Sequence, residues 1–341
     1  MKIIVDVFGG DYAPGEILAG CAAALKADEN LRLILAGAEK PVGLGLVKAG
    51  ADMKRCEVLD APDVITNDDA PVEAVKRKTE SSLVKALDRL KSDPEAAGLV
   101  SCGSTGAVLA GGLLRVGRIP GIPRPALAPV LPTLAGGGVM LIDCGANMDC
   151  KPAYLARFAL MGSAYMRAVY GIEKPRAALL SVGTEDKKGN ELSKAAFALL
   201  KTMRERGAVN FAGNMEARDC LSGEYDVIVA DGYVGNVALK SMEGALNAVL
   251  KLLKQTLKSS LKTKIGGALI QKDLKRTLGR MDYTKAGGAP FLGVEKVIVK
   301  SHGSSKAETV CASILQAKRE AERGVVGAIK AALKDMPPDN E

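Results

Sequence analysis

The stretch Ile3-Ile4-Val5-Asp6-Val7-Phe8-Gly9-Gly10-Asp11 decides the fold, because an apolar, β-branched run ends there in a glycine turn and an acid. Such a run is typical of a buried strand, and the glycines mark the loop that leaves it. Six further short apolar runs alternate with helical patterns, at residues 31–36, 98–101, 139–143, 177–182, 225–230 and 297–300. Strands separated by helices predict right-handed βαβ crossovers. We therefore expect an α/β fold of three layers, α/β/α, with a mostly parallel sheet.

The same stretch bears on where the protein works. Asp6 interrupts the N-terminal apolar run, which argues against a secretory signal, and no run approaches the roughly 18 apolar residues of a membrane span. The seven cysteines form no CxxC pair, and His302 is the single histidine. We expect a cytoplasmic protein with no disulfide framework and no metal site.

Proline and hydroxyl residues indicate where helices start. Pro14, Pro71 and Pro152 suit a first helical turn, and the pairs Ser104-Thr105 and Ser304-Ser305 can cap exposed amides. Residues 120–132 carry five prolines and predict an irregular crossover between two lobes. With 48% hydrophobic residues and no low-complexity linker, residues 1–341 are expected to form a single fold.

Six loops follow the expected strands, and each combines glycine with a hydroxyl, carboxylate or carboxamide. They are residues 9–11, 101–106, 143–147, 183–190, 231–236 and 302–305. In a parallel sheet such loops meet at the carboxyl edge, where helix N-termini offer free amides to an anion. One loop of this kind occurs in any α/β protein, but six together indicate a site for a small oxyanion.

Within these loops, two cationic or titratable side chains stand out. His302 ends an apolar strand, and Lys188 precedes a turn into a helix, whereas the adjacent Lys187 is expected to be solvated. The carboxylates in the loops are expected to orient amides rather than act as bases. No GxxxxGK[ST], no GxGxxG after the first strand and no GxSxG is present, which argues against a P-loop enzyme, a standard dinucleotide fold and an α/β hydrolase.

Read in order, the loops resemble the phosphate acyltransferase family of bacterial phospholipid synthesis. The matching stretches are residues 5–14, 101–107, 143–147, 210–219, 231–240, 287–290 and 302–305, with Ser104 standing where the family usually has asparagine. The resemblance implies a fold similar to the isocitrate and isopropylmalate dehydrogenases, a homodimer and no cofactor. It also implies transfer of a fatty acyl group from acyl carrier protein to inorganic phosphate. The acyl phosphate would then feed a membrane glycerol-3-phosphate acyltransferase in phosphatidic acid synthesis.

The loop positions and the resemblance together predict the site residues. We expect Lys188, Asn236 and His302 to be catalytic. The residues expected to bind phosphate and the acyl group are Gly10, Asp11, Gly103, Ser104, Thr105, Gly106, Asp143, Asn147, Asn214, Asp231, Gly303, Ser304 and Ser305.

Residues 240–285 carry eleven Lys and Arg against three acids, which accounts for the whole formal net charge of +8. Leucines at 246, 250, 253, 257 and 261 form one stripe, so residues 246–278 are expected to form a helical hairpin broken at Gly266-Gly267. Within the helical segment 234–285, the part near Val234 is expected to pair two chains, and Ile265, Leu269 and Ile270 to touch an anionic membrane surface. The leucine stripe is open to another interpretation, as core or dimer interface, and the lysines to docking of acyl carrier protein.

Two other functions remain to be weighed. One is an NAD-dependent hydroxy-acid dehydrogenase of the related fold, for which no clear cofactor loop is present. The other is a basic module that binds nucleic acid, but only 4% of residues are aromatic and tryptophan is absent, so stacking surfaces are scarce. We expect no nucleic-acid partner.

Overall fold

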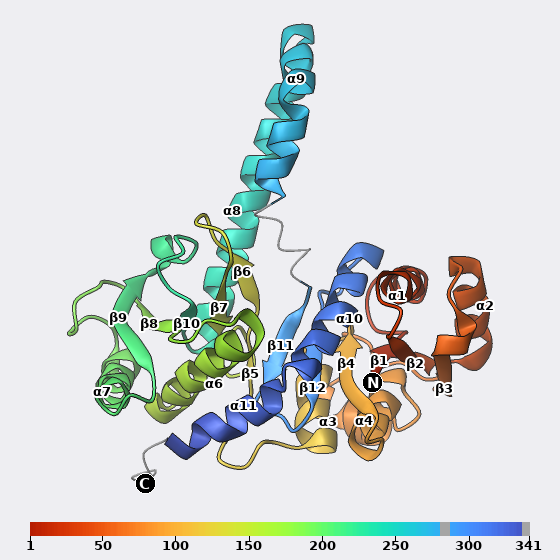
Figure 1. The fold of residues 1–341 in the computed structure, drawn as a ribbon, viewed down its shortest axis with the longest axis horizontal. Helices are drawn as coiled ribbons and strands as arrows, with labels where there is room; N and C mark the ends of the chain where they lie inside the picture. The colour runs from red at the N-terminus through yellow and green to blue at the C-terminus, as the bar shows by residue number, and fades with distance from the viewer. Residues whose placement is uncertain (280–286, 336–341) are drawn as a thin grey trace.

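The computed structural model describes residues 1–279 and 287–335, which form two α/β lobes and a long helical hairpin (Figure 1). Each lobe is built on its own sheet. One sheet has seven strands in the order β3-β2-β1-β4-β12-β11-β5, and the other has five in the order β6-β7-β10-β8-β9. The α/β class and the three layers are as predicted, but the strands divide between two sheets.

The seven-stranded sheet is parallel apart from its pairs β12–β11 and β11–β5. Its strands are β1 (Lys2–Asp6), β2 (Arg32–Gly37), β3 (Cys56–Asp60), β4 (Ala96–Ser101), β5 (Ala126–Leu127), β11 (Ala289–Leu292) and β12 (Val297–Lys300). One face packs on α1 (Gly15–Ala27), α2 (Glu39–Ala49) and α10 (Ala307–Glu322), and the other on α3 (Pro71–Arg77), α4 (Ser82–Ser92) and α5 (Thr105–Gly111). Burial on both faces explains why the strands are apolar throughout instead of alternating.

The five-stranded sheet is parallel apart from the pair β6–β7. Its strands are β6 (Val130–Pro132), β7 (Gly138–Ile142), β8 (Arg176–Ser181), β9 (Asn210–Glu216) and β10 (Val227–Val229). The helices α6 (Pro152–Tyr170) and α7 (Glu191–Glu205) cover one face, and the first turns of α8 (Gly232–Lys258) cover the other.

The lobes share apolar packing. Residues 126–132 pass from β5 in one sheet to β6 in the other, so the predicted crossover is confirmed. The helix α11 (Val325–Ala332) packs on α6, and one buried cluster joins Ile122 and Leu292 of the first lobe to Phe158 of the second. This shared core favours a single fold over residues 1–341, which stays a prediction.

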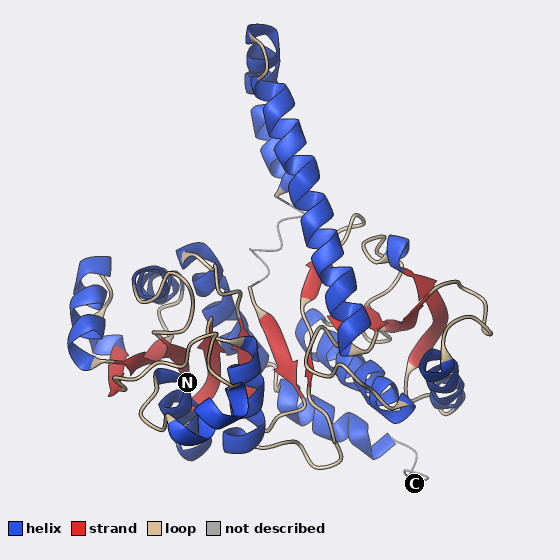
Figure 2. Cartoon of the chain, turned by 180° about the vertical axis from the view of Figure 1, so that it is seen from behind, coloured by secondary structure: helices blue, strands red, loops and turns tan. Residues whose placement is uncertain are grey.

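Beyond the first turns of α8, the hairpin of α8 and α9 (Leu261–Leu278) projects away from both lobes (Figures 1 and 2). The predicted break at Gly266-Gly267 is wrong, because α9 runs through it. The chain turns instead at Ser259 and Ser260, where the Ser260 hydroxyl and the Thr263 side chain form a reciprocal capping box. A Cβ added at Gly267 would make only ordinary van der Waals contact with Leu257, at 3.4 Å, and one added at Gly266 would meet nothing within 4 Å.

All seven predicted strands are confirmed to within two residues, and the short or edge strands β3, β5, β6, β9 and β11 were missed. The helix starts near Pro14, Pro71, Ser104 and Pro152 are confirmed. The start at Ser304-Ser305 is wrong. The helix α10 begins at Ala307, whose amide donates to Glu16 at 2.8 Å, while the Ser304 hydroxyl bonds His302.

Candidate functional site

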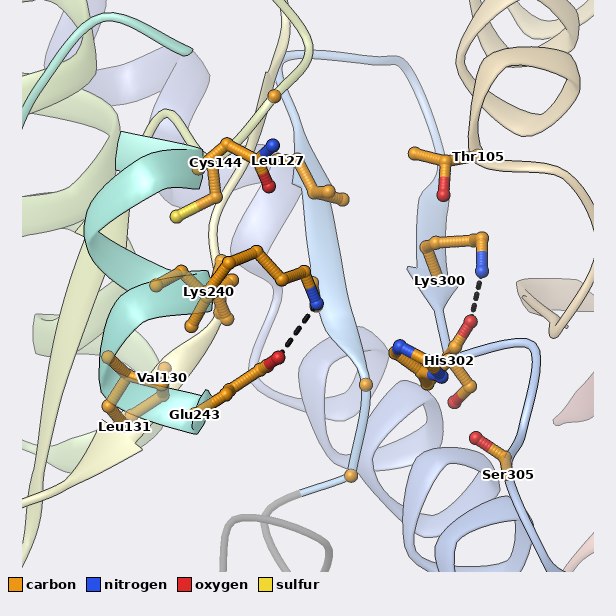
Figure 3. Close-up of a pocket in the computed structure, with 18 of the residues that line it drawn as sticks. Thr105, Leu127, Val130, Leu131, Cys144, Lys240, Glu243, Lys300, His302 and Ser305 are labelled. Carbon is orange, nitrogen blue, oxygen red and sulfur yellow. Dashed lines mark hydrogen bonds and ion pairs between the residues drawn. The ribbon is translucent and has the colours of Figure 1, made fainter. Parts of the chain in front are cut away.

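A cavity of about 470 Å³ lies between the lobes, where the carboxyl end of β12 faces the start of α8. Figure 3 shows the side chains of α8 on one wall and those of β12 and its following loop on the other. The lining contains both polar and apolar residues. The polar part includes Thr105, Asn236, Lys240, Glu243, Lys300, Ser301, His302, Ser304 and Ser305, and the apolar part includes Leu127, Pro129, Val130, Leu131, Met148 and Leu239.

The loop after β12 forms the polar end of this cavity. The Ser304 amide donates to Nδ1 of His302 at 3.2 Å, and the two side chains also lie within hydrogen-bond distance at 2.7 Å. Because Nδ1 accepts from the amide, the neutral ring carries its hydrogen on Nε2 and keeps that donor for a ligand. The hydroxyl oxygen of Ser305 is buried and has no hydrogen-bond partner in the described part of the chain.

Buried Asp6 holds the two neighbouring loops in place. Its carboxylate accepts hydrogen bonds from the hydroxyls of Ser82 at 2.6 Å and Ser101 at 2.7 Å, and Ser101 in turn accepts from the Gly103 amide at 3.0 Å. Burial raises the pKa of Asp6, and these hydrogen bonds oppose the rise. A Cβ at Gly9 would lie 2.5 Å from the carboxylate, so only glycine fits this position.

Asp143 has the same role in the second lobe. It is fully buried and accepts from the amides of Leu127, Ala146 and Asn147 at 2.9, 3.1 and 2.7 Å. Burial raises the pKa of this carboxyl group against those hydrogen bonds. Asp143 thus orients loop amides, as expected of the loop carboxylates, whereas Asp6 accepts from the two hydroxyls described above.

Asn236 reaches the cavity because the first turn of α8 packs tightly on the loop after β7. Asp231 caps the helix by accepting from the Val234 amide at 2.8 Å. A Cβ at Gly235 would lie 1.9 Å from the carbonyl oxygen of Asp143, so this glycine sets the distance between helix and loop.

The structure places two lysines in the cavity that the sequence reasoning missed. Lys240 on α8 donates to Glu243 at 2.8 Å, and Lys300 at the end of β12 donates to the carbonyl oxygen of Ser301 (Figure 3). Lys300 is only 7% exposed. Lys300 could have been predicted from the sequence, because it ends an apolar strand directly before Ser301 and His302.

Of the predicted site residues, the cavity brings together Asn236, His302, Thr105, Ser304 and Ser305. Other predicted residues belong to loops that contribute to the lining or adjoin it, but are not themselves among the described lining residues, namely Gly10, Asp11, Gly103, Ser104, Gly106, Asp143, Asn147, Asp231 and Gly303. The Asp11 amide, for instance, donates to the Gly303 carbonyl at 2.8 Å.

Lys188 and Asn214 are not among the described lining residues. The exposed Lys188 ammonium lies 3.9 Å from Glu185, and the Asn214 amide donates to the Glu185 carbonyl at 2.8 Å. Their roles stay predictions.

The comparisons decide the family. A family model described as "Fatty acid synthesis protein" matches residues 1–327. A phosphate acyltransferase of Halothermothrix orenii is 43% identical, over 98% of each chain, and one of Clostridium novyi is 45% identical, over 98% of this chain and 99% of the relative. The chain belongs to the phosphate acyltransferase family. It is an acyltransferase that acts on phosphate in lipid synthesis, and the predicted resemblance is confirmed.

Solved structures agree on the fold. A phosphotransacetylase from Streptococcus pyogenes superposes with a TM-score of 0.61 at 19% identity, over 94% of each chain. A putative 4-hydroxythreonine-4-phosphate dehydrogenase from Salmonella typhimurium gives 0.52 at 15% identity, over 94% of this chain and 98% of the other. The predicted dehydrogenase-like fold is thereby confirmed.

In residues 1–279 and 287–335, no group of three or more His, Cys, Asp or Glu side chains is arranged to hold a metal ion. Among the helices described, none has the length and apolar character needed to cross a membrane.

Proposed function

We propose that this acyltransferase takes its fatty acyl group from acyl carrier protein and delivers acyl phosphate to phosphatidic acid synthesis. The observation that carries the proposal is the two-sided cavity. On the side of β12 and its following loop it offers hydroxyls, the His302 ring and an ammonium group to phosphate (Figure 3). On the facing side, Val130 and Leu131 lie beside the Lys240–Glu243 pair and give apolar surface to a long acyl chain. Each methylene buried there contributes about 0.8 kcal/mol to binding.

Phosphate needs little activation, because it is already an anion at neutral pH. The site has to hold it against the thioester carbonyl and stabilise the oxyanion that forms there. The loop of His302, Ser304 and Ser305 suits phosphate, and the Asn236 carboxamide on the facing wall suits the oxyanion. One such donor is worth ~3 kcal/mol, about a hundredfold in rate.

The experiment mixes acyl carrier protein thioester and phosphate with the protein and traps acyl phosphate with hydroxylamine. Alanine at Asn236, His302 or Lys188 is expected to lower turnover by about tenfold to a thousandfold. Lys187→Ala is the matched control, because this neighbouring lysine is also exposed and is expected to be solvated. Normal turnover in all three variants would contradict the assignment, and no acyl hydroxamate from the wild type would contradict the function.

The hairpin supports two further parts of the proposal: a homodimer and peripheral contact with the anionic inner face of the cell membrane. Val237, Val249 and Leu252 on α8 are 49%, 60% and 63% exposed, which leaves apolar surface for the same helix of a second chain. Light scattering is expected to give twice the chain mass of 35.5 kDa. A monomer at micromolar concentration would refute the dimer.

The outer side of α9 carries Ile265, Leu269 and Ile270, all at least half exposed, among lysines. An apolar strip with about 1 kcal/mol from each nearby lysine would give reversible membrane attachment. Such attachment would bring the labile acyl phosphate close to a membrane glycerol-3-phosphate acyltransferase.

A further inference from the structure

Lys300 has a setting unlike that of the other lysines described. It ends β12, is 7% exposed and lines the cavity, where its ammonium nitrogen donates to the Ser301 carbonyl (Figure 3). In the described part of the chain, no carboxylate forms an ion pair with it. Holding an ammonium group in such a place is costly unless an anion arrives to pair with it.

The surroundings of Lys300 tune its proton affinity. Burial lowers the pKa of Lys300 to about 8. The ionisable groups that act on it are Asp6 and Asp11 beside β1, Cys102 after β4, and Lys240 on α8. Asp6 and Asp11 favour the charged form of Lys300 and Lys240 opposes it, whereas Cys102 is a neutral thiol, because burial raises its pKa to about 11.

On the basis of the acyl transfer proposed above, we propose that Lys300 gives its proton to the departing thiolate sulfur of the carrier. An oxygen of hydrogenphosphate attacks the thioester carbon and forms the C–O bond. The C–S bond then breaks, and its electron pair stays on sulfur, which takes a proton from Lys300. The neutral amine recovers the proton that hydrogenphosphate brought. The products are acyl phosphate dianion and free thiol, so atoms and charge balance.

The similar pKa values of Lys300 and of a thiol favour Lys300 as the proton donor to the leaving sulfur. A thiol has a pKa of about 8.5, close to that of Lys300, so the transfer is nearly isoenergetic at neutral pH. The bound phosphate keeps Lys300 protonated until the thiolate forms, because a neighbouring anion favours the charged form.

Other proton carriers in the cavity fit less well. Lys240 is half exposed, and its ammonium group is already paired with Glu243 at 2.8 Å. The Cys144 thiol is buried, and burial raises its pKa well above the usual range. His302 lies beside the phosphate-binding hydroxyls, where its Nε2 hydrogen suits a phosphate oxygen.

The test measures steady-state acyl hydroxamate formation from acyl carrier protein thioester and phosphate, from about pH 6 to about pH 10. Wild-type kcat/KM is expected to fall above a pH near 8, where Lys300 of the free enzyme loses its proton, and kcat is expected to fall at a higher pH, because bound phosphate favours the charged lysine. In Lys300→Met and Lys300→Gln, kcat should drop about a hundredfold or more and that alkaline limb should disappear, while the KM for phosphate changes less than about threefold. Lys296→Met is the matched control, since Lys296 also donates to a backbone carbonyl but lies outside the cavity lining, and it should behave as wild type.

Several outcomes would overturn the proposal. A raised phosphate KM with kcat retained would reduce Lys300 to phosphate binding, and an alkaline limb that persists in both variants would assign the proton to another group. Loss of folding in both variants would make Lys300 structural. If the wild type yields no acyl hydroxamate, the proposed function falls as well, which separates that failure from failure of the Lys300 role alone.

Discussion

Glu320 on α10 is a buried carboxyl group whose replacement should change how stability depends on pH. It is 1% exposed, and its Oε1 accepts from the Tyr165 hydroxyl at 2.6 Å and from the Gln316 amide at 2.8 Å. Gln316 also holds the Gly288 backbone at the cavity, through contacts of 2.8 and 3.1 Å. Glu320 is therefore connected to the cavity lining through one residue, Gln316.

The direction of the pH effect on folding stability follows from burial, which raises the pKa of Glu320 from 4.5 to about 7. Between these values the folded chain binds a proton that the unfolded chain has lost, so this group's contribution to folding stability falls as pH rises from about 4.5 to about 7. At ~1.4 kcal/mol per pH unit, the ceiling of the effect is ~3 kcal/mol.

Glu320→Gln removes the titration and keeps an oxygen that accepts both hydrogen bonds. Urea unfolding of both proteins at about pH 5 and about pH 8 should show the variant gaining about 2 kcal/mol relative to wild type at the higher pH. Tyr165→Phe is the control. Loss of that donor should cost about 1–3 kcal/mol and most at the higher pH, where the carboxylate is charged. If Glu320→Gln and wild type differ equally at both pH values, the reasoning is refuted.

Two further predictions concern the position of α8 and the exposed apolar residues of α9. Gly235→Ala would place a Cβ 1.9 Å from the Asp143 carbonyl, so it should cost about 1–3 kcal/mol of stability and more than tenfold in acyl transfer. Gly244→Ala, where the added Cβ meets nothing within 4 Å, should be harmless, and equal activity of the two variants would contradict the packing account. The double variant Leu269→Glu, Ile270→Glu should lose flotation with anionic vesicles but keep acyl transfer, and flotation equal to wild type would discard the membrane contact.

The sequence alone determined seven of the described strands, most of the helix starts and the edge where the site lies. Apolar runs such as residues 3–8 and 297–300 are local patterns, and parallel strands bring their following loops to one edge whatever the strand order. Asn236 and His302 could therefore be placed at the site from their positions directly after strands. The hairpin could also be predicted, because the leucines from Leu246 to Leu257 repeat at helical spacing.

The tertiary structure alone decided what depends on distant contacts. The division into two sheets rests on short strands such as β5 and β6, whose pairing has no local signal. The position of the hairpin turn is a local difference: it falls at Ser260 rather than Gly266 because the reciprocal cap between Ser260 and Thr263 starts a new helix, and the sequence analysis missed that signal. Lys300 lines the cavity, whereas Lys188 is not among the described lining residues. The burial of a lysine side chain and the surface that it reaches depend on how the two lobes face each other, and residue type and loop position do not encode that arrangement.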